Sequence, residues 1–157
     1  MGNNYNLERF LRPQEKMYDT AYSELKRGKK RTHWMWYIFP QIRGLARSRK
    51  AFVFGIKDID EAKAYIAHPL LGPRLIDSCE AVLQYAGRPP EDIFGEVDAM
   101  KLRSSMTLFA LVCGERSVFH KVLQCFFGGE MDQNTVGLIS GKIIDATCVK
   151  YAQAFIN

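Results

Sequence analysis

The sequence lacks several features that assign a chain quickly to a class of protein. None of its 157 residues belongs to an apolar stretch approaching the ~20 residues that a membrane-spanning helix needs. The opening residues, MGNNYNLERF, lack the apolar run of a secretion signal. The motifs GxGxxG, GxxxxGKS/T, HExxH and GxSxG are missing as well, so no motif indicates a cofactor or a known catalytic centre. These absences predict a cytoplasmic protein without membrane association and without a cofactor.

Cysteine is scarce and widely spaced. The four cysteines are Cys79, Cys113, Cys125 and Cys148, and no two of them form a CxxC pair. None has a neighbouring ligand at zinc spacing, so no metal site is predicted. Because all four lie in apolar segments, we expect reduced core cysteines and no disulfide.

Alternating strand patterns are also missing, and apolar residues at helical spacing take their place. Helices are predicted over residues 6–27, from Ser48 to about Gly55, and over 58–68, 73–87, 97–114, 116–128, from Asp132 onward and over 141–157. The β-prone stretches AFVFGI and VFHKVLQCFF are too short or too helix-periodic to form a sheet. The predicted fold class is all-α: a compact single-domain multi-helix bundle over residues 1–157, with at most one or two very short strands.

Positive charge is concentrated in the first third of the chain. Residues 1–50 hold 12 Lys or Arg against 4 Asp or Glu, a balance of +8, whereas residues 51–157 hold 10 against 13, a balance of −3. The densest run is KRGKKR, residues 26–31. This asymmetry favours a local positive face that binds a phosphate or another anion.

The segment HWMWYIFPQIRG, residues 33–44, follows this basic run directly and contains both tryptophans. One interpretation is a core wedge, because aromatic side chains dominate the energetics of protein cores. The other is the wall of a binding site, because a core wedge does not require the polar residues that flank these aromatics. The candidate ligand-binding residues of this segment and its continuation are Trp34, Trp36, Tyr37, Gln41, Arg43, Arg47 and Ser48, and His33 is a candidate proton carrier.

Two further segments could contribute to the same site. In His68-Pro69-Leu70-Leu71-Gly72-Pro73-Arg74, a helix ends and the next begins, and free backbone N–H groups beside Arg74 could bind an anion. A plain corner between two helices is the alternative. Asp98, Lys101 and Ser105 lie on one face of a predicted helix. Either this face lines a cleft, or Asp98 and Lys101 form a surface ion pair and the serine packs against another helix.

Four stretches of the sequence carry a resemblance to the family called domain of unknown function 1810. They are NLERFLRPQEKMYDTAYSELKRGKKR, KRTHWMWYIFPQIRGLARS, EAKAYIAHPLLGPRL and IFGEVDAMKLRSSMTLFA, in order and over nearly the whole chain. The family usually has GLGxS where this chain has Ala46 in place of the second glycine. The resemblance implies an all-helical fold and no established activity. At the level of pattern, the chain also resembles NADAR-type proteins, which are associated with NAD and ADP-ribose.

Basic groups, stackable aromatics and a carboxylate together favour an anionic, ring-containing metabolite such as a nucleotide or an ADP-ribose-like compound. Asp98, His33 and His68 are the candidate catalytic residues if the site processes its ligand, and the residues leave catalysis open. Two alternatives remain: single-stranded nucleic-acid binding through residues 26–37, and a helical protein-interaction module.

Overall fold

The computed structural model describes residues 5–142 and contains nine α-helices and no strand in this range. Their bounds are Glu8–Lys26 (α1), Met35–Ile38 (α2), Arg49–Val53 (α3), Ile59–Ala67 (α4), Leu71–Leu83 (α5), Pro90–Phe94 (α6), Glu96–Cys113 (α7), Val118–Phe127 (α8) and Gln133–Lys142 (α9). The all-α prediction is confirmed. The predicted closing helix lies almost entirely beyond residue 142, outside the described residues, as does Cys148.

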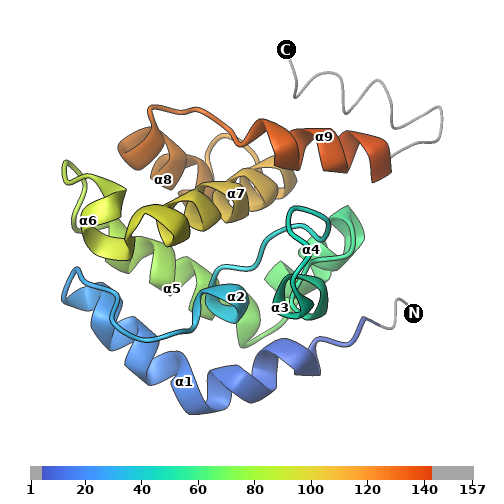
Figure 1. Cartoon of the computed structure of the whole chain (residues 1–157), viewed down its shortest axis with the longest axis horizontal. Coiled ribbons are helices and arrows are strands. Elements are labelled where there is room, and N and C mark those ends of the chain that lie inside the picture. Colours follow the sequence, from blue (N-terminus) through green and yellow to red (C-terminus); the bar gives the residue numbers. More distant parts are fainter. Residues whose placement is uncertain (1–4, 143–157) are drawn as a thin grey trace.

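Helix α7 occupies the middle of the bundle. It packs against α4, α6, α8 and α9, while α1 and α5 lie side by side below it (Figure 1). Its residues from Ser104 to Leu111 are all buried, which explains why apolar residues occur around the whole helix and not on one stripe. Between residues 5 and 142, none of the helices has the length and apolarity required to cross a bilayer.

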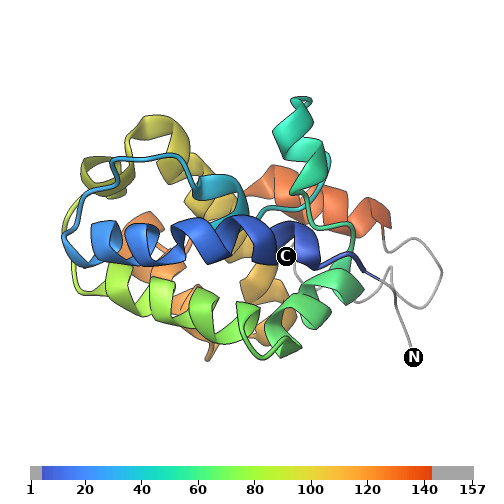
Figure 2. The same ribbon diagram turned by 90° about the horizontal axis from the view of Figure 1, so that it is seen from below.

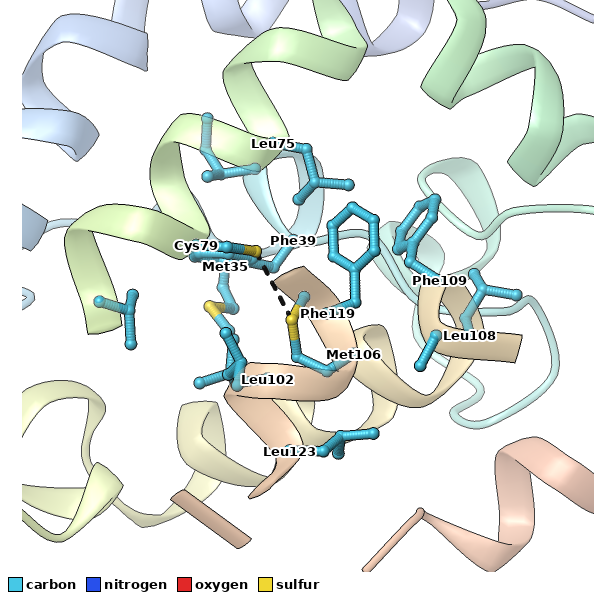
Figure 3. Packing of buried hydrophobic residues seen from close by; sticks show 14 of the residues in the cluster. Met35, Phe39, Leu75, Cys79, Leu102, Met106, Leu108, Phe109, Phe119 and Leu123 are labelled. Carbon is cyan, nitrogen blue, oxygen red and sulfur yellow. Dashed lines mark hydrogen bonds between the residues drawn. The ribbon is translucent and has the colours of Figure 1, made fainter. Parts of the chain in front are cut away.

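The core is built from large side chains that α2, α5, α7 and α8 contribute together (Figure 3). In its centre the thiol of Cys79 lies 3.6 Å from the sulfur of Met106. Burial raises the pKa of the Cys79 thiol. Cys113 and Cys125 are exposed, so the prediction of core cysteines is correct for Cys79 and wrong for these two, which sit on the outward faces of α7 and α8.

Local sequence signals set several helix boundaries. The Ser48 hydroxyl accepts a 3.1 Å hydrogen bond from the N–H of Ala51 and caps α3, and the Asp58 carboxylate caps α4 in the same way. At the corner between α4 and α5, a Cβ atom on Gly72 would lie 2.0 Å from the carbonyl oxygen of Ile66. Only glycine therefore allows this close approach of the two chain segments.

Candidate functional site

A cleft of about 150 Å³ opens where the segment before α2, α2 itself, α3 and the start of α7 meet. We call it the tryptophan cleft. Its basic and acidic lining residues are Lys30, His33, Lys50, Asp98 and Lys101, and the others are Trp34, Met35, Trp36, Tyr37 and Phe54. In Figure 2 the segment before α2 and the raised helix α3 lie on the same side of the molecule, with α2 between them.

Two lysines pair with one carboxylate in this cleft. The ammonium nitrogen of Lys30 lies 2.9 Å from Asp98 Oδ2, and that of Lys101 lies 3.5 Å from Asp98 Oδ1. Lys30 also donates a 2.6 Å hydrogen bond to the carbonyl oxygen of Thr32. Only 7% of the Lys30 side chain is exposed, so this lysine belongs to the inner part of the cleft.

The same two ammonium groups lie over the two indole rings. Lys30 Nζ is 5.0 Å from the ring centre of Trp34, and Lys101 Nζ is 4.0 Å from that of Trp36. Each arrangement is a cation–π contact, which stabilises both the lysine and the ring orientation. Trp34 is fully buried, whereas Trp36 is partly exposed and presents its ring to the cleft.

A buried carboxylate fixes the segment that leads into α2. Glu24 accepts hydrogen bonds from the N–H groups of Arg31 and Thr32, from the Thr32 hydroxyl and from the indole nitrogen of Trp34. Burial by itself would raise the pKa of Glu24, but these four hydrogen bonds outweigh it and lower the pKa to about 2. The basic segment therefore follows a defined path around an ionised carboxylate.

Two arginines hold the opposite wall. Arg43 donates from Nε to the carbonyl oxygen of Phe52 at 2.9 Å, and its guanidinium lies 4.3 Å from the centre of the Phe52 ring. Arg9 donates to the carbonyl oxygens of Val53 and Gly55 and forms a buried ion pair with Glu61 at 2.7 Å. These bonds fix the chain on both sides of Phe54, which lines the cleft.

Six of the predicted site residues line the tryptophan cleft: His33, Trp34, Trp36, Tyr37, Asp98 and Lys101. Gln41 lines a neighbouring hollow of about 10 Å³, which shares Trp36 and Phe54 with the cleft. The aromatic segment thus contains both a core residue and a residue of the cleft wall, which the sequence had left as alternatives. Trp34 is a core residue by burial, and Trp36 is a wall of the cleft.

The remaining predicted residues lie elsewhere or have other partners. Arg43 and Arg47 are not in the cleft lining, and Ser48 caps α3. Arg74 donates to the side-chain oxygen of Gln14 at 3.3 Å, which ties α5 to α1. Ser105 is buried inside α7, and its hydroxyl has no hydrogen-bond partner among the described residues.

At the α4–α5 corner, for which the sequence left an anion site and a plain corner as alternatives, the backbone N–H groups have partners within the chain. His68 Nδ1 accepts hydrogen bonds from the N–H groups of Leu70 and Leu71 at 3.1 and 3.3 Å, and the N–H of Gly72 donates to the His68 carbonyl oxygen. Pro73 has no N–H. The start of α5 therefore has no free backbone N–H group, and His68 acts as a helix cap outside the lining of the tryptophan cleft.

Four residues of the cleft lining were not predicted from the sequence: Lys30, Met35, Lys50 and Phe54. Glu24, which fixes the segment before α2, was not predicted either. Lys30 was visible as part of the basic run, but nothing in the pattern distinguished it from its exposed neighbours. The signal for Glu24 was a carboxylate on the last turns of a helix, just before six residues that include five basic ones. Such a carboxylate is well placed to accept hydrogen bonds from the segment that follows.

Comparison with known proteins agrees with this architecture. The sequence profile of the family described as "Protein of unknown function (DUF1810)" matches residues 4–139. The chain belongs to the DUF1810 family. It is also similar to the crystal structure of the conserved hypothetical protein Rv1873 from Mycobacterium tuberculosis, with 44% sequence identity and a TM-score of 0.85. That match covers 88% of this chain and 99% of the Mycobacterium chain. No curated protein matches the sequence.

Proposed function

We propose that this DUF1810 protein binds a small metabolite with a planar ring and an anionic group, such as a nucleotide or an ADP-ribose-like compound, in the tryptophan cleft. The observation that carries the proposal is the convergence of a partly exposed indole with three lysines in one cleft. These side chains come from four separate parts of the chain: the basic run, α2, α3 and α7.

Charge supports the anionic part of the ligand. Lys30, Lys50 and Lys101 face a single carboxylate, Asp98, so the cleft has an excess of positive charge. Lys30 and Lys101 already share Asp98, whereas Lys50 is exposed and has no ion-pair partner among the described residues. The ligand anion is therefore bound by Lys50 at the mouth of the cleft and by Lys101 further in.

Aromatic surface supports the ring. Trp36 offers a partly exposed indole, and stacking of a base on an aromatic side chain contributes about 1–3 kcal/mol. The volume of about 150 Å³ is smaller than the roughly 300–1,000 Å³ typical of sites that enclose a drug-sized ligand. The cleft therefore encloses one ring, and the rest of a nucleotide extends outward.

Arg43 and Arg47, which the sequence indicated as anion ligands, have a different place in this proposal. Arg43 supports α3 through Phe52, and α3 in turn carries Lys50. Arg43 therefore does not contact the anion but fixes the position of α3, which carries Lys50. In this proposal the ligand anion is contacted directly by lysines and not by arginines.

The test is isothermal titration calorimetry with AMP and ADP-ribose. Lys101→Ala and Trp36→Ala should each weaken binding by about tenfold or more, because a hydrogen bond to a charged group contributes about 1.5–3 kcal/mol and stacking a comparable amount. The matched control is Lys57→Ala, an exposed lysine outside the cleft lining, which should bind like the parent. Absence of binding at millimolar concentration, or unchanged affinity in Trp36→Ala, would refute the proposal.

A further inference from the structure

Exposed basic side chains are frequent in the two chain segments that contribute Lys30 and Lys50 to the tryptophan cleft. Arg27, Lys29 and Arg31 are exposed on the segment between α1 and α2, and we call them the first basic rim; Arg27 and Arg31 also line a separate hollow of about 360 Å³ beside α1. Arg47, Arg49 and Lys50 are exposed at the start of α3, and we call them the second basic rim. None of the six has a carboxylate partner within residues 5–142.

Each rim is connected along the chain to one lysine of the cleft lining. Lys30, next to two members of the first rim, points into the cleft and pairs with Asp98. Lys50, a member of the second rim, lines the cleft as well. A ligand in the cleft therefore lies against two segments that are rich in exposed basic side chains, and a single phosphate group would contact only part of this charge.

Exposed carboxylates lie on α6 and at the start of α7, near the residues that contribute Asp98 to the cleft. They belong to Glu91, Asp92 and Glu96. The N–H of Lys30 donates a 2.8 Å hydrogen bond to the carbonyl oxygen of Ile93, so α6 lies directly beside the first basic rim. A long anion is thus repelled from α6 and directed from the first rim towards the second.

We infer that the ligand of the tryptophan cleft is one nucleotide of a single-stranded nucleic acid, with its base against Trp36 and its flanking phosphates along the two basic rims. This inference rests on the proposed function and names its ligand class. A cleft of about 150 Å³ takes one base and leaves the backbone outside, where the rims lie. The base of a duplex is stacked and paired, whereas a single strand presents unstacked bases to aromatic side chains.

The experiment is fluorescence anisotropy with a labelled single strand of about ten nucleotides, a length within the ~4–16 nucleotides that single-strand sites commonly cover. The strand should bind at least tenfold more tightly than AMP. Its affinity should fall with salt at a logarithmic slope of about −2 to −3, as expected when three or four phosphates are neutralised. Inorganic polyphosphate of equal charge should bind more weakly than the strand, because it has no base to stack.

Variants distinguish the contribution of the two rims to binding from that of the cleft. Arg31→Ala and Arg49→Ala, one from each rim, should together reduce the affinity for the strand about tenfold and lower the magnitude of the salt slope by roughly 1.4, while AMP binding changes little. Trp36→Ala should remove the preference for the strand over polyphosphate. Lys121→Ala, an exposed lysine on α8, is the matched control and should bind like the parent.

The outcomes distinguish this inference from the proposed function. If AMP binds in the cleft but the strand binds no more tightly, the inference fails and the proposed function stands. If neither binds, both fail. Strand binding that is insensitive to Trp36→Ala, or equal binding of a duplex of the same sequence, would also overturn the inference, because the base would then not enter the cleft.

Discussion

The indole nitrogen of Trp34 donates a 2.8 Å hydrogen bond to the buried carboxylate of Glu24. Through this bond the last turns of α1 determine where the aromatic segment begins. The same carboxylate accepts hydrogen bonds from the backbone N–H groups of Arg31, the last residue of the basic run, and of Thr32. Trp34 is thereby fixed in the core, while Trp36, two residues later, faces the cleft.

Replacing Glu24 should destabilise the protein strongly. In Glu24→Gln, an amide NH₂ group would face donors that now bond to a carboxylate oxygen. Since one hydrogen bond to a charged group contributes about 1.5–3 kcal/mol, we expect a loss of about 3 kcal/mol in the free energy of unfolding. Urea denaturation followed by tryptophan fluorescence measures it. Glu15→Gln, an exposed position on the same helix, should change stability by less than about 0.5 kcal/mol. Equal stabilities of the two variants would contradict the role of Glu24.

The low pKa of Glu24 predicts an acid-dependent part of the stability. The folded chain has a pKa of about 2 at this carboxyl, below the ordinary value of 4.5 that applies when the chain is unfolded. The stabilisation is therefore fully present above pH 4.5 and is lost as the pH falls from 4.5 towards 2. Between these pH values the parent protein should lose more stability than Glu24→Gln, which cannot titrate there. Parallel pH profiles for the two proteins would exclude this linkage.

The close approach at the α4–α5 corner can be tested by replacing Gly72, with Gly137 in α9 as the control position. Gly72→Ala places a Cβ 2.0 Å from the Ile66 carbonyl oxygen, so α4 and α5 must separate, and we expect a loss of about 1–3 kcal/mol. Gly137→Ala, in α9, meets no described atom within 4 Å and should stabilise the helix by roughly 0.5–1 kcal/mol. Thermal unfolding of both variants measures the difference. A tolerated Gly72→Ala would show that the corner is not set by this contact.

The sequence predicts most of the helices because their signals are local. Two predicted helices begin at Ser48 and Asp58, and these residues cap α3 and α4, because a hydroxyl or carboxylate before a helix accepts a hydrogen bond from its first turn. The sequence also indicated that Trp36, Asp98 and Lys101 could contribute to one site, and all three line the tryptophan cleft. An aromatic segment and a polar helix stripe each need a partner surface, and here they are partners of one another.

The arginines and His68 show where the sequence is insufficient. Arg43 faces Phe52 because the parallel bridge between Ile42 and Ile56 brings the two ends of this segment together. No periodicity in the sequence encodes that pairing. The His68 imidazole accepts from backbone N–H groups that the sequence alone left free. Both assignments depend on which of several possible partners a long or adaptable side chain meets in three dimensions.

The chain has two tryptophans, so its two indole N–H signals in a ¹H–¹⁵N spectrum report directly on the tryptophan cleft. Trp36→Phe assigns them by removing one signal. On titration with AMP, the Trp36 signal should shift progressively and saturate, while the Trp34 signal moves much less because its N–H remains bonded to Glu24. If the Trp36 signal does not move at millimolar AMP or ADP-ribose, or if only the Trp34 signal moves, the cleft is not the binding site.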